Sequence, residues 1–338
     1  MIEARALAGP VSALPGFDSA TYRPHRLHAE DVVWVEKNCY VDIWIELLHA
    51  LDLEPLAALG FTAALDFEGD CWTFFKPPHE DLRELFGIDV QELNVWRPLI
   101  DHAAEYLSAG KFISTEADSF WLPDTSGTDY RTNHVKTTVV FVELDVAARR
   151  LGYFHNAGYH QLEGEDFART FGLDQPADPA ALPLFAEVVR ADRINRRPPR
   201  ELALIARELL RKHVAHRPNS NPVTRFQERF ESDFPEIQER GLAYFHAWAF
   251  ATLRQLGAGA ELLAQHLRWL ETNGAMHNGN AAAEDFERLS GHAKAFILKI
   301  ARAVNAKRPL DASALFGEMG AASESGMAQI VAALDSAP

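Results

Sequence analysis

The sequence predicts an α+β protein with helices first, an antiparallel sheet second and a helical domain last. Apolar residues recur at helical spacing in the first hundred residues, and β-branched runs that end at turns follow. Strand signals then disappear beyond a proline-marked linker. We therefore expect a first domain over residues 1–178, including an N-terminal arm, and an all-α bundle over residues 179–338.

The whole-chain composition indicates a globular protein of two domains. The 338 residues are 47% hydrophobic and carry a formal net charge of −15, which argues against nucleic acid and anionic membranes as partners. No apolar run approaches a membrane span, and the N-terminus lacks the basic start and apolar core of a signal peptide. Two cysteines suggest free thiols in a reducing compartment, so we expect a cytoplasmic protein.

The first thirty residues, rich in Pro, Gly, Ala and His, predict an extended arm. His25 and His28 have a spacing that metals use, but no Cys, His or Asp pair stands nearby in the sequence. We interpret both as surface residues and predict no metal site. Helices are expected at 39–51, 54–65, 79–86 and 95–109, with a short aromatic strand after the turn near residue 70.

From Lys111 the pattern changes to strands. A β-rich run ends at Pro123, a polar loop follows, and a long β-branched strand begins at His134. Its hairpin partner is expected at 148–159. Beyond Asp174 come a linker at 175–183, helices at 200–215, 223–232, 235–256, 259–273 and 284–306, and a frayed C-terminus with one short helix.

Cys39 stands where an irregular approach turns into an apolar helix. Asn38 is a candidate N-cap, which places Cys39 in the first turn, where unpaired N–H groups and the helix dipole favour an anion. A thiol there is expected to ionise more easily than a free one. Cys71 lacks such a setting and is interpreted as a small buried hydrophobe.

A cysteine nucleophile needs a base within hydrogen-bond reach, and a third group that fixes the base. His134 opens a strand, and the adjacent strand carries His155 and Asn156 at a height that could meet its ring. The order Cys, His, Asn is also that of papain-like folds. The alternative is a buried thiol and a loop-end histidine, and spacing alone leaves both open because the chain has fourteen histidines.

Three further residues are candidates for lining the site. Asp118 is either a strand-end carboxylate that binds an amine or a solvated turn residue. Tyr130 and Lys136 flank His134 in the sequence. Lys136 should point to the same side of the strand as His134, where it could favour a thiolate or contact phosphate; otherwise it is an exposed sheet-edge lysine.

The segment Arg190–Arg217 has nine Lys or Arg residues against three acidic ones, a local balance of +6. Such a patch on an acidic protein can attract an acidic partner. A solvated helix face with ion pairs is the alternative.

Four stretches, taken in order, resemble a bacterial family of unknown function, domain-of-unknown-function family 1839: WVEKNCYVDIWIELLHALDLEPLAAL, DSFWLPD, DYRTNHVKTTV and LGYFHNAGY. The likeness covers nearly the whole chain. In its first half that family is similar to the N-terminal domain of butirosin biosynthesis protein H, over roughly residues 30–170 here. That protein is a papain-like acyltransferase that moves an acyl group from the phosphopantetheine thioester of a carrier protein to an amine.

The resemblance implies a papain-like first domain with Cys39 as nucleophile and His134 as base. Asn156 takes the orienting position that is aspartate in many relatives. An acyl carrier protein, which is acidic and would suit Arg190–Arg217, and a small-molecule amine are the implied partners. Phosphopantetheine would belong to the carrier, and no cofactor of the chain's own is expected.

One position departs from the papain-like pattern. A glutamine usually precedes the cysteine and completes the oxyanion hole, but Val33 and Trp34 stand at the expected place. The backbone N–H of Cys39 and the side chain of Asn38 are the remaining candidate donors. Two other functions stay open: a cysteine hydrolase of the same fold, and a non-catalytic binding protein that keeps the cysteine in its core.

Overall fold

The structure is a computed structural model that describes residues 9–173 and 184–336. It divides into two compact units. The first, the sheet unit, comprises residues 1–29, 39–53 and 82–196; the second, the helical unit, comprises 30–38, 54–81 and 197–338. The predicted single division at residue 178 differs, because 30–38 and 54–81 pack with the helices. The predicted linker 175–183 lies outside the described residues.

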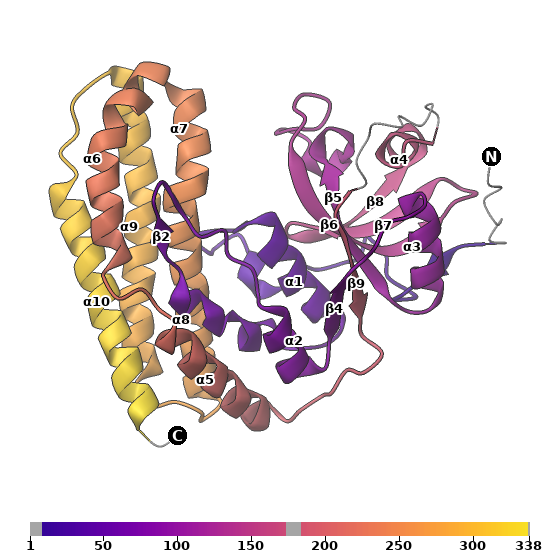
Figure 1. Ribbon diagram of the computed structural model, residues 1–338, viewed down its shortest axis with the longest axis horizontal. Coiled ribbons are helices and arrows are strands. Elements are labelled where there is room, and N and C mark those ends of the chain that lie inside the picture. The colour runs from indigo at the N-terminus through magenta and orange to yellow at the C-terminus, as the bar shows by residue number, and fades with distance from the viewer. Residues whose placement is uncertain (1–8, 174–183, 337–338) are drawn as a thin grey trace. The chain divides into compact units, whose positions relative to one another are not determined.

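The sheet unit contains one antiparallel sheet in the order β4-β9-β5-β6-β7-β8, with β1 also paired to β6 (Figure 1). An antiparallel sheet region combined with a helical region confirms the α+β class. The strands are β1 Val11–Ser12, β4 Asp89–Glu92, β5 Phe112–Asp118, β6 Lys136–Asp145, β7 Arg150–His155, β8 Gly158–Glu163 and β9 Ala186–Arg190.

Strand β9 shows that the expected end of strand signals at Asp174 is wrong. It lies between β4 and β5, and four of its five residues are buried. A strand covered on both faces shows no polar–apolar alternation, so period-2 patterning does not reveal it.

Helices pack on the sheet and give it two distinct faces. Val139 and Phe141 of β6 join a core cluster with residues of α3 (Leu99–Ser108). Because side chains alternate along a strand, Lys136 and Thr138 face the opposite side, where α1 (Cys39–Ala50) packs on β6 and β7. The unit's other short helical elements are η1 Arg26–His28, most of α2 (His79–Phe86), η3 Ser119–Trp121, η4 Pro123–Thr125 and α4 Gly164–Thr170.

The interpretation of His28 as a surface residue is wrong. Its ring is buried between two carboxylates of α1, with Nε2 3.0 Å from Asp42 Oδ1 and Nδ1 against Glu46. Tyr22 donates its hydroxyl hydrogen to Glu46 as well. These contacts explain how an apolar helix buries two acidic side chains, since each carboxylate accepts hydrogen bonds from the N-terminal arm.

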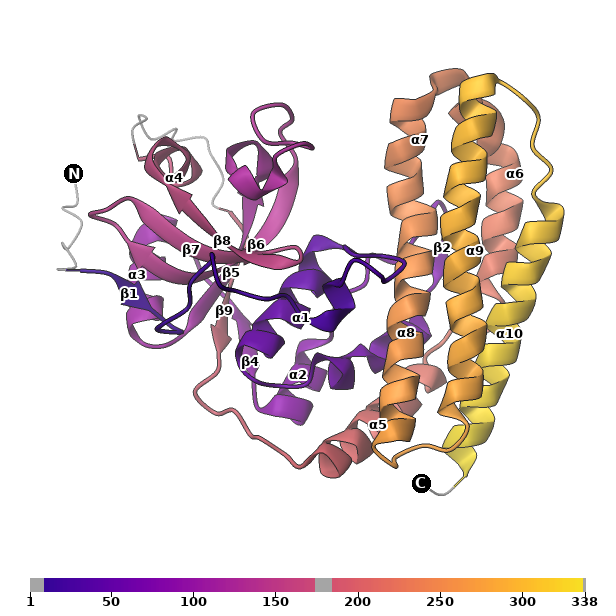
Figure 2. The ribbon, with the colours of Figure 1, turned by 180° about the vertical axis from the view of Figure 1, so that it is seen from behind.

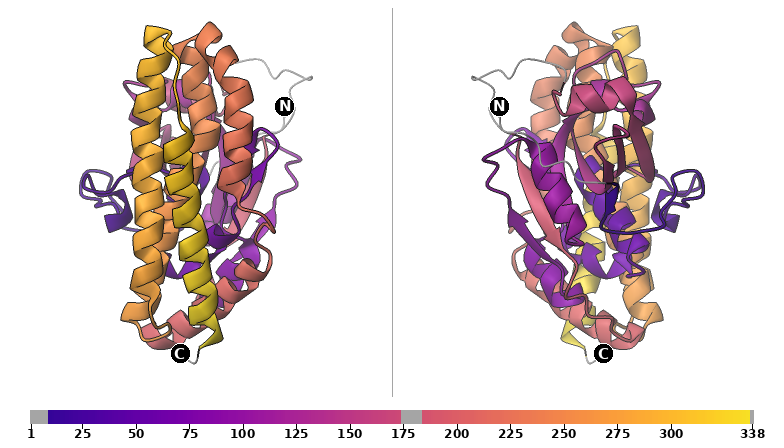
Figure 3. Two further views of the ribbon diagram at one scale, coloured as in Figure 1. Left: turned by 90° about the vertical axis from the view of Figure 1, so that its left-hand side faces the viewer. Right: turned by 90° about the vertical axis from the view of Figure 1, so that its right-hand side faces the viewer.

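The helical unit is built around long helices that lie side by side (Figures 2 and 3). Helix α7, a π-helical segment η5 and α8 follow one another without a break and pack on α9, which packs on α10. The elements are η2 Pro55–Ala64, β2 Phe67–Glu68, β3 Cys71–Trp72, α5 Pro199–Ala215, α6 Pro222–Arg240, α7 Leu242–Ala249, η5 Phe250–Arg254, α8 Gln255–Thr272, α9 Gly279–Ala306 and α10 Ser313–Asp335.

Helix α10 corrects the expectation of a frayed C-terminus. Phe316, Met319, Ala322, Gly326 and Ile330 recur at spacings of three and four and are buried. Small residues between the large ones let α10 approach α9 closely, and their low hydrophobicity hides the stripe in the sequence. Among the described residues, no helix is both long and apolar enough to cross a membrane.

Candidate functional site

Cys39 is the first residue of α1, as predicted, and is half-buried. Its thiol lies 3.9 Å from the hydroxyl oxygen of Thr138 on β6. Thr138 pairs across the sheet with Glu116 of β5. The side chain facing the thiol is therefore a neutral hydroxyl and not a histidine.

His134 lies just before β6 and pairs with a carboxylate. Its Nδ1 is 2.6 Å from Asp118 Oδ2, and its ring stacks on Phe120 at 4.3 Å between centroids. The His134 and Asp118 side chains are 67% and 38% exposed. If Nδ1–H donates to the carboxylate, Nε2 becomes the basic nitrogen and faces a solvated environment.

Cys39 and the His134–Asp118 pair lie toward the same face of the sheet but are not joined by a hydrogen bond between described residues. Asp118 pairs with Lys136 in register and Glu116 with Thr138, which puts these side chains on the face covered by α1. His134 is four residues from Thr138. An extended chain advances about 3.3 Å per residue, so the two are about 13 Å apart along the chain.

The third group beside His134 is thus Asp118, and Asn156 lies elsewhere. Asn156 follows β7 in a two-residue turn to β8, with His155 paired to Gly158, and has φ of +46°. Asparagine is favoured at this left-handed turn position for its backbone alone. Its side chain makes no hydrogen bond to another residue in the described ranges.

His155 belongs to a buried chain of hydrogen bonds on the other face of the sheet. Its Nδ1 lies 2.5 Å from Asp124 Oδ2, and its Nε2 lies 2.7 Å from Thr137 Oγ1. Tyr153 also donates to Asp124. Burial opposes ionisation of Asp124, but the hydrogen bond and charge of His155 outweigh it and hold the pKa of the carboxyl below its usual range. This chain anchors the β5–β6 connection, which carries His134.

Tyr130 and Lys136 make contacts of their own. The Tyr130 hydroxyl donates to Asp166 of α4 at 2.8 Å, and Arg131 binds the same carboxylate at 2.5 Å. Lys136 donates to Glu116 at 2.8 Å. The Lys136 side chain is 72% exposed, and Tyr130 anchors the β5–β6 connection to α4.

The residues that lead into Cys39 are held by α8, within the helical unit. Glu261 accepts hydrogen bonds from the backbone N–H groups of Val33 and Trp34 at 2.8 and 3.1 Å. Burial raises the pKa of Glu261. Arg254, at the end of the π-helical segment, donates to the carbonyls of Glu36 and Lys37. Val33 and Trp34 occupy the place of the expected glutamine, and their backbone N–H groups attach this segment to α8.

The side chain of Asn38 is turned into the helical unit. Its amide nitrogen donates to the Phe75 carbonyl at 3.1 Å and lies 3.5 Å from the Gln255 side-chain oxygen. Both amide hydrogens have acceptors there, which leaves neither for an oxyanion in this conformation. The backbone N–H of Cys39 is the candidate donor that remains from the sequence prediction.

Many cations of the Arg190–Arg217 segment bind the chain itself. Arg190 lies 3.7 Å from Asp89, and Arg211 lies 3.3 Å from Glu208. Arg207 is buried and donates to the carbonyls of Leu334 and Ser336. The free positive charge of this segment is therefore smaller than its sequence balance of +6.

Thr138 and Asp124 are the site residues that sequence reasoning missed. Strand alternation could have indicated Thr138, because positions 134, 136 and 138 share a parity. Asp124 lies in a polar loop and has no pattern that predicts its long-range contact with His155. In the described ranges, no group of three or more His, Cys, Asp or Glu side chains is arranged to hold a metal ion.

Family comparisons match almost the whole chain. The DUF1839 N-terminal domain matches residues 23–191, and the DUF1839 C-terminal domain matches residues 199–332. The gap between the two matches contains residue 196, where the sheet unit ends. No curated protein matches the chain, and the likeness of its first half to butirosin biosynthesis protein H stays an expectation. The chain belongs to the DUF1839 family.

Proposed function

We propose that this protein is a cysteine-dependent acyltransferase with a papain-like sheet unit. One observation carries the proposal: Cys39 begins α1 on the sheet face toward which the His134–Asp118 pair also lies. A thiol at a helix start receives the field of unpaired N–H groups, and the pair offers a carboxylate-oriented imidazole.

The first step is thioester exchange. Cys39 Sγ attacks the acyl carbonyl of a thioester donor, the new Sγ–C bond forms, and the donor's S–C bond breaks. The proton lost by Cys39 passes to the departing thiolate. Because a thioester is exchanged for a thioester, the step is nearly balanced, and amide formation drives the reaction that follows.

The second step uses the His134–Asp118 pair on the acceptor. Asp118 attracts a protonated amine, and His134 Nε2 accepts its proton, directly or through one water molecule. The amine nitrogen then attacks the acyl carbonyl and the C–Sγ bond breaks. The second proton lost by the nitrogen passes to the departing thiolate and restores the Cys39 thiol. Because the same nitrogen must contact both His134 and the acyl carbon on Cys39, this step requires the segment before β6 to bring His134 closer to Cys39 than the distance of about 13 Å between Thr138 and His134 along the chain.

The donor we propose is a thioester between an acyl group and the phosphopantetheine arm of a carrier protein. We propose that the reaction takes place in the cytoplasm, where the two free cysteines remain reduced. Docking near Arg190–Arg217 would use the cations that are not already paired. Neutralising the exposed Arg193 should then raise the KM for the carrier and leave kcat unchanged.

The experiment supplies an acyl-loaded carrier protein with and without candidate amines and identifies the products by mass spectrometry. The proposal expects amide formation that requires Cys39 and falls strongly in His134→Gln, while the exposed control His216→Gln stays active. If the carrier loses its acyl group at the same rate with and without an amine, the protein is a hydrolase and not a transferase. The exposure of His134 favours that alternative, because water reaches its ring.

A non-catalytic binding role is the third candidate. It is favoured by the Thr138 hydroxyl beside the thiol, since threonine is no base at neutral pH. If neither Cys39→Ala nor His134→Ala changes acylation of the protein by a thioester, the enzyme proposal fails and this role remains.

A further inference from the structure

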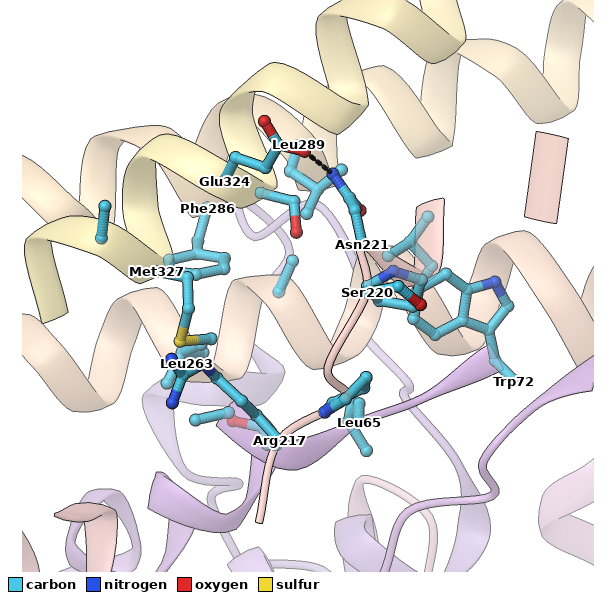
Figure 4. A pocket seen from close by; sticks show the side chains of 18 of the residues that line it. Leu65, Trp72, Arg217, Ser220, Asn221, Leu263, Phe286, Leu289, Glu324 and Met327 are labelled. Atoms are coloured by element: carbon cyan, nitrogen blue, oxygen red, sulfur yellow. Dashed lines mark hydrogen bonds between the residues drawn. The ribbon is translucent and has the colours of Figure 1, made fainter. Parts of the chain in front are cut away.

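A cavity of about 530 Å³, open to solvent on the side that carries the exposed Arg217 and Ala328, is formed by the helical unit (Figure 4). Small-molecule sites in proteins typically have volumes of roughly 300–1,000 Å³. Its walls come from η2, β3, the α5–α6 connection, α8, α9 and α10. The cavity is thus formed where many elements of one compact unit meet.

The wall is mainly apolar. Leu256, Leu263 and Phe286 are buried, whereas Leu65 and Met327 are half-buried. Met327 contributes a flexible thioether that can adapt to the shape of a ligand.

Close helix packing fixes this wall. A Cβ added at Gly326 of α10 would lie 2.8 Å from the Phe286 ring of α9, so glycine is needed for the approach of the two helices. The cavity is therefore a pre-formed space with one adaptable side.

The polar side chains that line the cavity differ in how many of their hydrogen-bonding groups already have partners in the protein. Asn221 caps α6 by accepting from the Val223 N–H at 3.0 Å, and its amide nitrogen donates to the Gly320 carbonyl and to Glu324 at 3.0 and 3.1 Å. Both amide hydrogens of Asn221 are thus used, one of them by the Glu324 carboxylate. Arg217 lies at the opposite end of the cavity from Glu324 (Figure 4).

Arg217 is the cation of the cavity. It donates one hydrogen bond, to the Val214 carbonyl at 2.7 Å, and makes no ion pair with any residue in the described ranges. A guanidinium carries five N–H donors in a planar fork that matches a carboxylate. An apolar cavity with one unpaired cation at its end fits a ligand with an apolar body and one anionic group.

We propose that this cavity binds an aliphatic carboxylic acid, with its chain against Leu263, Phe286 and Met327 and its carboxylate on Arg217. A cationic amphiphile would be repelled by Arg217. A dicarboxylic acid would bring its second charge toward Glu324. The proposal is independent of the reaction at Cys39, because every lining residue belongs to the helical unit.

The test titrates the full-length protein with octanoate, decanoate and dodecanoate by calorimetry, below their micelle concentrations. Burial of a methylene contributes about 0.8 kcal/mol, so affinity should rise by up to about fourfold per added methylene until the cavity is full. Dodecanol and dodecyltrimethylammonium should bind more weakly than dodecanoate. Arg217→Gln should weaken dodecanoate about tenfold, while Arg200→Gln, another exposed arginine, should leave it unchanged.

A second pair of variants tests the location of the ligand. Ala328→Phe adds a ring to the exposed part of the wall and should abolish binding; Ala332→Phe, one turn along α10 and outside the lining, should not. The Ala328 site is exposed, so folding is preserved and is checked by thermal unfolding. Absence of dodecanoate binding to the wild type overturns the proposal, as does binding that survives both Arg217→Gln and Ala328→Phe.

Discussion

Replacing His266 with asparagine should reduce the loss of folding stability in acid. His266 of α8 is wholly buried, and its Nδ1–H donates to the Leu56 carbonyl at 2.7 Å. Its Nε2 has no hydrogen-bond partner in the described structure. Burial lowers the pKa of His266 from 6.5 to about 4 in the folded state.

The sign follows from proton linkage. Between the folded pKa near 4 and the unfolded pKa near 6.5, the unfolded chain binds the proton and the folded chain does not. Stability from this residue is therefore complete above the unfolded pKa and is lost as pH falls toward the folded one. The integrated loss between pH 7 and pH 5 is about 2 kcal/mol, approaching about 3 kcal/mol at pH 4.

Urea unfolding at pH 5 and pH 7, at constant ionic strength, measures this loss. Asparagine can keep the hydrogen bond to Leu56 but fills less of the buried space than the histidine ring, so His266→Asn should lower stability at both pH values. Asparagine also does not titrate. The variant should then lose about 2 kcal/mol less than the wild type between them. An equal loss in both proteins would refute the assignment of the pH dependence to His266.

Two further substitutions test contacts that support the candidate site. Gly257→Ala would bring a Cβ to 2.4 Å from the buried Trp34 ring, so it should lower the free energy of unfolding in urea by about 1–3 kcal/mol. The control is Gly291→Ala, whose added Cβ would have no neighbour within 4 Å and which should be neutral or stabilising. A stabilising Gly257→Ala would contradict the close packing of α8 on Trp34. Asp124→Asn should cost about 1–3 kcal/mol. Because the folded-state pKa of Asp124 is lowered, its contribution is present above the unfolded pKa and fades in acid, so wild type and variant should converge as pH falls through that range.

The parts of the fold that the sequence predicts are those whose signal is local. The helix at Cys39 has an apolar stripe and an N-terminal boundary, and the strand after His134 has a β-branched run. Their elements occur where the pattern places them, although β6 begins two residues after His134. The sequence does not predict strand β9, because its residues do not alternate between polar and apolar. It does not predict the length of helix α10, because the buried stripe of that helix contains small residues.

The candidate site is less predictable, because it depends on contacts across the sheet. Strand parity predicts that Lys136 and His134 share a face, but the partner of His134 depends on the β5–β6 register, which brings Asp118 opposite Lys136. Asn156 has a side chain that could orient a histidine, yet its left-handed backbone forms part of the β7–β8 hairpin turn. A sequence cannot separate a turn asparagine from a catalytic one when both follow a strand.

The most direct test of the central claim is the intact mass of the protein after incubation with an acyl thioester of pantetheine. The wild type and Cys71→Ala should each gain one acyl group that hydroxylamine removes, and Cys39→Ala should gain none. An acyl group retained in Cys39→Ala, or none on the wild type with any acyl donor, would contradict the assignment of Cys39 as the nucleophile.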